Sequence, residues 1–322
     1  MILFFFAFWL SAAEYSIVFV HIGNTIPSYT LDAIHQARLF NKNCPIYLLG
    51  NQRALLSLGQ AAKECKMVSL ESLSQTADHR IFIQQDRHNG LFRYANERFF
   101  YLEEFVRSAG LTQVFHLEND VMLYADLEEF LPLFQKIYQG KMGATFDSDQ
   151  RCIPGFVYFS DPGVLQKLTQ FIASQTRTGM NDMALLSRFK DNNRASADYL
   201  PILPPSYAAR FLLSNDLGQV ALDPSVFFSH FDQFQSIFDA ACIGQYWGGI
   251  DPIHRNSKPG FINETSFLHP QNCSLEWRED AEGRMVPFLG IGGNQFRINN
   301  LHIHSKNLIA FSSDNPRPLE PP

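Results

Sequence analysis

Residues 114–126 read Val-Phe-His-Leu-Glu-Asn-Asp-Val-Met-Leu-Tyr-Ala-Asp, and this stretch says most about the fold. A buried strand at 113–117 runs directly into Glu118-Asn119-Asp120. Ligands of open α/β sheets bind beyond the carboxyl ends of the strands. Two carboxylates placed there, two residues apart, can share Mg²⁺ or Mn²⁺, which keeps room for phosphate oxygens and water. The alternative is a solvated turn after a buried strand.

Strand and helix patterns alternate on both sides of this stretch. Continuous apolar runs predict buried strands, and apolar stripes at helical spacing predict helices. The predicted strands are 15–22, 45–49, 67–70, 142–146 and 153–160, and the clearest helices are 93–108 and 126–138. This alternation predicts an α/β, Rossmann-like fold with a mostly parallel central sheet flanked by helices.

The chain is predicted to form a single domain over residues 14–312. No low-complexity linker interrupts it, but beyond about residue 200 the alternation gives way to long loops, aromatic clusters and a Gly-rich stretch. We therefore expect an elaborated C-terminal half. Residues 313–322 are Pro-rich and are predicted to be a disordered tail.

The first 13 residues, MILFFFAFWLSAA, are almost wholly apolar. They resemble the apolar stretch of a signal peptide or a short anchor, although no Lys or Arg precedes them. A buried first strand or a misassigned start would also explain the run. Localisation is left open, with membrane association or the secretory pathway favoured slightly over the cytoplasm.

The amino-acid composition narrows the classes of protein to which the chain can belong. With 46% hydrophobic and 18% charged residues, the 322-residue chain can bury a large core. The net charge is -6 and no block of Lys and Arg stands out, which argues against nucleic acid as a partner. The five cysteines are scattered without a CxxC pair, so neither a disulfide framework nor a zinc site is indicated.

A second motif lies late in the chain, at Leu301-His-Ile-His-Ser-Lys306. Because side chains alternate along an extended segment, His302 and His304 share a face. A neutral imidazole can complete a Mn²⁺ shell, and the Lys306 ammonium can balance a phosphate. Two partly buried structural histidines beside a surface lysine are the alternative.

With these two motifs the chain resembles nucleotide-sugar glycosyltransferases of the GT-A fold, whose DxD motif is similar to Glu118-Asn119-Asp120. The resemblance implies that Glu118 and Asp120 bind a divalent metal, Mn²⁺ or Mg²⁺, or the diphosphate of a UDP- or GDP-sugar, with Asn119 beside the donor. It makes His304 a further metal ligand and places Lys306 on the phosphate. Glu in the first acidic position also allows contact with the ribose or a bridging water instead of the metal.

The same resemblance implies further donor contacts. His21, Gly23 and Asn24 end the first strand, where GT-A enzymes hold the nucleotide base, and an ordinary strand-ending turn is the alternative. Arg93 and Arg98 lie on the helix before the acidic motif, where related transferases place an Arg near the donor. A solvated helix face explains these two arginines equally well.

Asp182 begins a helix in the half of the chain where acceptors bind in such enzymes. In inverting members an acidic residue at this kind of position is the base toward the acceptor hydroxyl, and in retaining members it lies near the donor sugar. The alternative is a helix cap, worth about 1 kcal/mol. The sequence does not decide between inversion and retention.

Acceptor-binding candidates surround the Gly-rich stretch. They are Asp239, Trp247, Gly248 and Gly249. The Trp ring could stack on the apolar face of a sugar, and the glycines allow the loop to bend. Packing in the core is the alternative for Trp247. The acceptor itself, whether glycan, lipid or protein, is not identified by the sequence.

Missing motifs exclude several enzyme classes. The chain has no GxGxxG, GxxxxGK[ST], GxSxG or HExxH motif, and no Gly-rich, Arg-containing N-terminal loop of the sugar nucleotidyltransferases. The sequence therefore predicts a metal-dependent glycosyltransferase. A non-catalytic relative that binds nucleotide sugars or carbohydrates, and a secreted interaction protein, are the alternatives.

Overall fold

The computed structural model describes residues 14–88, 90–251 and 258–314. The predicted signal or anchor segment, 1–13, lies outside these residues, as does most of the predicted tail. Two residues assigned to the tail are packed: Ser313 is buried and hydrogen-bonds Gln36, and Asp314 pairs with His35. None of the described helices is long and apolar enough to cross a membrane.

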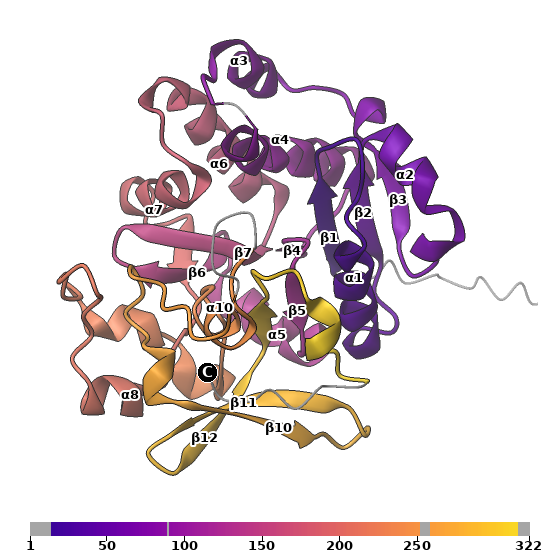
Figure 1. Ribbon diagram of the computed structural model, residues 1–322. Coiled ribbons are helices and arrows are strands. Elements are labelled where there is room, and N and C mark those ends of the chain that lie inside the picture. Colours follow the sequence, from indigo (N-terminus) through magenta and orange to yellow (C-terminus); the bar gives the residue numbers. More distant parts are fainter. Residues whose placement is uncertain (1–13, 89, 252–257, 315–322) are drawn as a thin grey trace, which may run out of the picture.

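A seven-stranded sheet forms the centre of the molecule (Figure 1). Its strands are β1 (Ser16–His21), β2 (Ile46–Gly50), β3 (Lys66–Ser69), β4 (Val114–Leu117), β6 (Met142–Ser148), β7 (Arg151–Phe159) and β8 (Ala197–Tyr199). Their order is β3-β2-β1-β4-β7-β6-β8, and only the two pairings made by β7, with β4 and with β6, are antiparallel. The predicted α/β fold with a mostly parallel sheet is confirmed.

Helices cover both faces of this sheet. The helices of the described residues are α1 (Tyr29–Phe40), α2 (Gln52–Leu58), α3 (Ala77–Gln85), α4 (Leu91–Ala109), α5 (Leu127–Ile137), α6 (Pro162–Ser174), α7 (Asp182–Asn192) and, in the C-terminal half, α8 (Pro205–Arg210), α9 (Phe231–Phe234) and α10 (Ile243–Gly248). Helices α3, α4, α6 and α7 pack together above the sheet in the view of Figure 1. Short 3₁₀ helices occur at Gly59–Ala62, Leu70–Ser72, Thr176–Thr178, Pro224–Phe228, Pro270–Asn272 and Leu308–Phe311.

Local sequence signals explain the ends of the helices that carry the site. Gly110 takes a left-handed conformation at the end of α4. The side chain of Asp126 accepts a hydrogen bond from the backbone N–H of Glu128 at the start of α5. Asn181 caps α7 in the same way, so the polar residues before these helices fix where each begins.

The C-terminal half contains more regular structure than the sequence pattern predicted. Strands β9 (Ser236–Ile237), β10 (Ser274–Glu279), β11 (Met285–Ile291) and β12 (Asn294–Ile298) form a second sheet, which lies below the first in Figure 1. Strand β13 (Asn300–His302) pairs antiparallel with β5 (Val121–Leu123), which follows the acidic motif. The end of the chain is thereby returned to the centre of the fold.

An aromatic core joins the two halves. Phe115 of β4 packs against Phe134 of α5 and Tyr158 of β7, and Phe134 also contacts Phe234 and Phe238. The rings meet edge-on or tilted at centroid distances of 4.9 to 6.2 Å, in the range favoured by aromatic pairs. Much of the phenylalanine excess therefore lies in the core.

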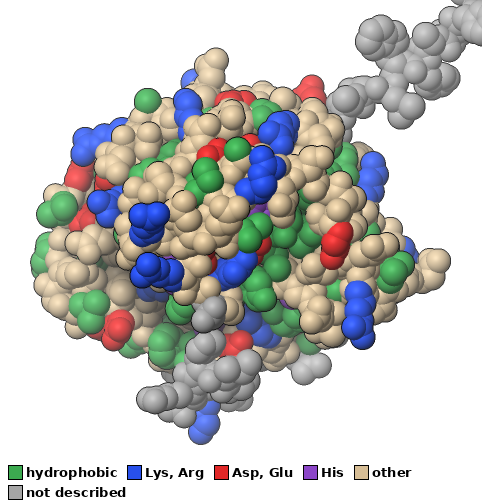
Figure 2. All heavy atoms as spheres, turned by 90° about the horizontal axis from the view of Figure 1, so that it is seen from above, with side chains coloured by type: hydrophobic (Ala, Val, Ile, Leu, Met, Phe, Trp, Pro, Cys, Tyr) green, Lys and Arg blue, Asp and Glu red, His purple; other side chains and the backbone are tan. Residues whose placement is uncertain are grey.

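The face of the molecule seen in Figure 2 carries Lys and Arg in small groups and not in one stripe.

Candidate functional site

A pocket of about 350 Å³ opens at the carboxyl ends of β1 and β4. It brings together two motifs that lie far apart in the sequence. They are the acidic residues after β4 and the residues at the end of β13 and just beyond it. The predicted site residues that line it are His21, Arg98, Glu118, Asn119, Asp120, Asp182, His304 and Lys306. The predicted convergence on one cleft is confirmed.

Glu118, Asp120 and His302 form a group whose ligand atoms all lie within 4.8 Å of one another. The Nε2 atom of His302 lies 3.4 Å from Glu118 Oε2 and 3.2 Å from Asp120 Oδ1. The sequence analysis assigned the imidazole ligand to His304, whereas the structure places His302 against the carboxylates. His304 lines the same pocket, and its Nδ1 accepts a hydrogen bond from the backbone N–H of Asp251 at 3.2 Å.

Backbone hydrogen bonds explain why the side chains of Glu118, Asp120 and His302 meet. The N–H of Glu118 donates to the carbonyl of Gly155 in β7, and the N–H of Val121 donates back to the carbonyl of Glu118. The acidic residues therefore occupy a tight turn between β4 and β5. Because His302 is the residue of β13 opposite Val121, antiparallel pairing holds its imidazole over this turn.

Close packing holds the backbone of His302 in place. The buried carboxylate of Asp239 accepts hydrogen bonds from the N–H of His302 at 3.0 Å and of Gly244 at 2.9 Å. A Cβ on Gly244 would overlap the carbonyl of His302, and a Cβ on Gly155 would lie 2.8 Å from its Nδ1. Glycine is therefore required at position 244 against the backbone of His302 and at position 155 against its imidazole.

Arg98 of α4 connects the acidic motif to α7. Its Nη2 lies 2.6 Å from Glu118 Oε1 and 2.9 Å from Asp182 Oδ2. Burial alone would lower the pKa of this guanidinium, but the two carboxylates outweigh it and raise the pKa. Arg98 is thus a permanent cation between the candidate metal ligand and the candidate base.

Lys306 supplies a second cation at the other carboxylate. Its ammonium forms an ion pair with Asp120 and lies 5.8 Å from the centre of the Tyr29 ring. Burial acts to lower the pKa of Lys306, yet Asp120 raises it overall. The ammonium therefore faces the pocket in its charged form.

The carboxylates of the group are held ionised. Burial would raise the pKa values of Glu118 and Asp120, but Arg98, His302 and Lys306 outweigh it and lower both. Burial would likewise lower the pKa of His302, and the two carboxylates raise it instead. The cluster thus favours the charged form of each of these three side chains.

The pKa values of Asp182 and His304, two other pocket residues, shift in the opposite directions to those of the carboxylates and the imidazole of this group. The pKa of Asp182 is raised, because burial outweighs the effect of Arg98. The pKa of His304 is lowered to about 4, chiefly by burial and by Lys306. Asp182 is thus a carboxylate with increased affinity for a proton, as expected of a base, and His304 is a neutral imidazole near pH 7.

The donor set fits a hard or borderline divalent ion. Two carboxylates and one imidazole are ligand types that Mn²⁺ accepts, and they would leave positions for phosphate oxygens. Several buried polar atoms of the pocket have no hydrogen-bond partner among the described residues, namely Arg98 Nε, Asn119 Oδ1 and His302 Nδ1. Native structures leave few such atoms unpaired, so they suit a site that binds polar ligands.

Three predicted donor contacts lie outside the described pocket lining. The N–H of Gly23 donates to Asn51 Oδ1 at 2.8 Å, and Asn24 is exposed nearby. Arg93 pairs with Glu97 one helical turn away, at 3.3 Å. Their roles at the donor stay predictions.

The predicted acceptor residues are mostly buried. Asp239 is 1% exposed and uses its carboxylate on backbone N–H groups, and Trp247 is 5% exposed. Gly248 would place a Cβ against Phe311, and Gly249 has a positive φ of 81°. None of them is among the described residues that line the pocket, and contacts with an acceptor stay predictions.

Among the pocket residues that were not predicted from sequence, Arg151 and Gln245 carry polar side chains suited to a ligand. Arg151 begins β7, and Gln245 lies on α10. The spacing of Asp147 and Arg151 across the turn between β6 and β7 was the available signal, because an ion pair joins them at 3.2 Å. Nothing local marks Gln245, since α10 reaches the pocket only through tertiary packing.

Comparison with known proteins gives matches only at the level of structure. No protein-family model matches the chain, and no curated protein matches it. The chain is similar to mouse xyloside xylosyltransferase 1, with 10% identity, a TM-score of 0.42, and coverage of 61% of this chain and 90% of that one. It is also similar to the galactosyltransferase LgtC in complex with donor and acceptor sugar analogues, with 16% identity, a TM-score of 0.42, and coverage of 66% and 81%.

A glucose-1-phosphate thymidylyltransferase from Bacillus anthracis in complex with a sucrose matches as well. Its identity is 8%, its TM-score is 0.36, and the match covers 58% of this chain and 87% of that one. Several of the matched structures are glycosyltransferases, the class that the two motifs resemble. Every one of these TM-scores is below 0.5.

Proposed function

We propose that this protein is a metal-dependent glycosyltransferase that moves a sugar from a nucleotide-diphosphate donor to a hydroxyl group. The observation that carries the proposal is the meeting of Glu118, Asp120 and His302 in one pocket with Lys306. Two carboxylates and an imidazole suit a divalent ion, and the adjacent ammonium suits the phosphates that such an ion binds. The donor class is a UDP- or GDP-sugar.

The chain's own groups would divide the chemistry between them. Glu118, Asp120 and His302 would hold Mn²⁺ or Mg²⁺, which as a Lewis acid stabilises the charge that develops on a leaving diphosphate. Lys306 would donate to a phosphate oxygen and add to that stabilisation. Arg98 keeps Glu118 ionised and oriented, because it contacts that carboxylate at 2.6 Å.

Asp182 would act on the acceptor or the sugar. It lines the pocket at the start of α7, and Arg98 contacts one of its oxygens at 2.9 Å. In an inverting reaction its carboxylate would take the proton of the acceptor hydroxyl as the hydroxyl oxygen attacks the anomeric carbon. In a retaining reaction it would stabilise positive charge on the sugar ring.

The test is a thermal-shift screen of UDP, GDP and their sugars, each with and without Mn²⁺, followed by turnover measurements. A donor at about 100 times its Kd stabilises the protein by ~2.7 kcal/mol, or roughly 5 °C in Tm. We expect this shift only when Mn²⁺ is present. No shift with any donor would overturn the proposal.

Asp120→Asn supplies the variant arm, because it removes one charge at nearly constant shape. We expect it to abolish the Mn²⁺-dependent shift and to lower turnover roughly 100-fold or more. Asp232→Asn, at an exposed position on α9, is the matched control and should behave as the parent protein. Metal-dependent donor binding without transfer or hydrolysis would instead identify a non-catalytic nucleotide-sugar-binding protein.

A further inference from the structure

Arg151 is a pocket residue that the roles proposed above do not use. It is the first residue of β7, directly after the turn from β6, and its side chain lines the pocket. Gly155, which contacts the acidic motif, lies four residues further along the same strand. The described contacts of the Arg151 guanidinium are with Asp147, Asn263, Thr265 and Met183, and none of them is with a candidate metal ligand.

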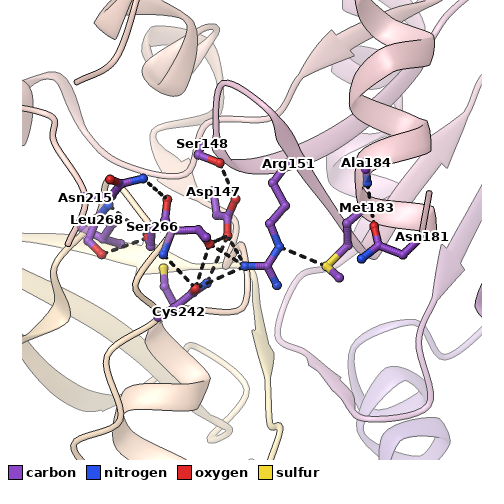
Figure 3. A network of polar contacts seen from close by, with 12 residues as sticks. Asp147, Ser148, Arg151, Asn181, Met183, Ala184, Asn215, Cys242, Ser266 and Leu268 are labelled. Atoms are coloured by element: carbon purple, nitrogen blue, oxygen red, sulfur yellow. Dashed lines mark hydrogen bonds and ion pairs between the residues drawn. The ribbon is translucent and has the colours of Figure 1, made fainter. Parts of the chain in front are cut away.

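A buried polar cluster fixes this guanidinium (Figure 3). The Nη1 atom donates to Asp147 Oδ2 at 3.2 Å and to Asn263 Oδ1 at 3.3 Å, and it also contacts Thr265 Oγ1. The side chain of Asp147 is 0% exposed and also accepts hydrogen bonds from Ser148, Asn263 and Thr265. Since so many partners hold one nitrogen, the orientation of the arginine is preorganised.

The other edge of Arg151 faces the start of α7. Its Nε donates to the sulfur of Met183 at 3.2 Å, and Met183 is the neighbour of Asp182, the proposed base. The remaining nitrogen, Nη2, has no hydrogen-bond partner among the described residues, and no contact is drawn to it in Figure 3. Two N–H groups are thus available next to the place where a reacting hydroxyl would lie.

Charge and geometry both favour a neutral partner for these N–H groups. Asp147 already balances the charge of Arg151, and Asp182 is a second carboxylate nearby. Bidentate binding of a carboxylate would need Nη2 together with either Nη1 or Nε. Nη1 and Nε already have hydrogen-bond partners, in Asp147 and Met183. Hydroxyl oxygens, which accept one hydrogen bond each from Nη2, fit what remains.

We propose that Arg151, positioned by Asp147, recognises the hydroxyl groups of a neutral saccharide bound beside Asp182. The inference rests on the proposed function, because that function brings a sugar into this pocket. The saccharide could be the sugar of the donor or the acceptor, and the chemistry of recognition is the same for both. Asp147 acts through the arginine and is a positioning residue.

Two variants and a control test the proposal. Arg151→Met removes the donor N–H groups, and Arg151→Lys keeps a charge beside Asp147 in case the first variant does not fold. Arg188→Met on α7 is the matched control, since Arg188 is exposed and, like Arg151, donates to a methionine sulfur, that of Met180. Circular dichroism and Tm check that each variant is folded.

Sugar-dependent binding is measured in two arms with Mn²⁺ present. The donor arm compares the Kd of UDP and GDP with that of their neutral sugar conjugates, and the acceptor arm probes an array of neutral and uronic-acid glycans in the presence of UDP or GDP. We expect the variants to weaken binding of the sugar about 10-fold in one arm, which identifies its source, and to leave the Kd of the bare nucleotide unchanged.

Three results would overturn the inference. They are sugar binding that survives in both variants, a preference for uronic acids over neutral glycans, and a parent protein without sugar-dependent binding in either arm. The bare nucleotides test the proposed function separately. If UDP and GDP bind with Mn²⁺ while the sugar arms give one of these results, only the role of Arg151 is rejected.

Discussion

Replacing Gly244 by alanine should disturb the candidate metal site without replacing a candidate ligand. The new Cβ would overlap the carbonyl oxygen of His302, and would lie 2.8 Å from its carbonyl carbon and 3.0 Å from its backbone nitrogen. These are backbone atoms of a paired strand, so no side chain can rotate out of the way. Ordinary contact begins near 3.4 Å, so α10 and β13 must separate by roughly 1 Å.

The cost can be divided into stability and metal binding. Overpacking of this kind costs about 1–3 kcal/mol of unfolding free energy. A shift of about 1 Å at His302 moves its imidazole out of ligand position, and losses of 10- to 100-fold in Mn²⁺ affinity are typical when the support of a metal ligand is removed. Urea unfolding measures the first quantity, and titration of Mn²⁺ followed by electron paramagnetic resonance measures the second.

Gly248→Ala is the matched control on the same short helix. Its Cβ would meet only side-chain atoms, the ring of Phe311 at 3.1 Å and a methyl group of Ile303 at 3.6 Å, which can adjust. We expect this variant to retain the parent affinity for Mn²⁺. If Gly244→Ala binds Mn²⁺ as tightly as Gly248→Ala does and is equally stable, the packing argument for His302 is wrong.

Three further predictions concern buried charges. Arg98→Met should lower the free energy of unfolding by about 3–5 kcal/mol in urea titrations without metal, since it leaves two buried carboxylates without their partner; a loss below about 1 kcal/mol would contradict this. Asp239→Asn should cost roughly 3 kcal/mol or more in the same assay, because an amide replaces acceptor capacity used by backbone N–H groups, and parent-like stability would refute it. Burial acts to lower the pKa of His79, but Glu104 and Glu97 raise it overall. The ion pairs of His79 should therefore stabilise the fold fully below the unfolded pKa near 6.5, and progressively less as the pH rises through the folded pKa. The free energy of unfolding measured from pH 6 to 9 should show this loss in the parent protein and not in His79→Gln.

The part of the site that could be predicted from sequence is the part encoded locally. A continuous apolar run ending in Glu118-Asn119-Asp120 needs only the strand period and the strand-end rule to be recognised. The alternation of His302 and His304 correctly put both histidines at the pocket. Which of them meets the carboxylates depends on the register of β13 against β5, and the sequence of either strand alone does not contain that register.

The second sheet was missed although local signals for it exist. Gly283 and the pair Gly292-Gly293 have positive φ and lie in the turns that join β10, β11 and β12, where hairpins favour glycine. Strands β10 and β12 also alternate, with Leu275 and Trp277 in β10 and Phe296 and Ile298 in β12 at every second position. The bond from Asp239 to the N–H of Gly244 is local, but its bond to the N–H of His302 in β13 could not be predicted, because the two residues are 63 positions apart.

The charges of the pocket explain how one geometry can exist both with and without an ion. Glu118 and Asp120 carry negative charge beside the positive charges of Arg98 and Lys306. The two carboxylates also raise the pKa of His302, which favours a proton on its imidazole. A divalent ion must displace that proton, because only the neutral imidazole can be a ligand. Metal therefore replaces one positive charge with two, and the surplus is what an anionic diphosphate would balance. Since backbone contacts to Asp239 and Gly244 fix His302 in either state, the ligands need not be reorganised when the ion enters.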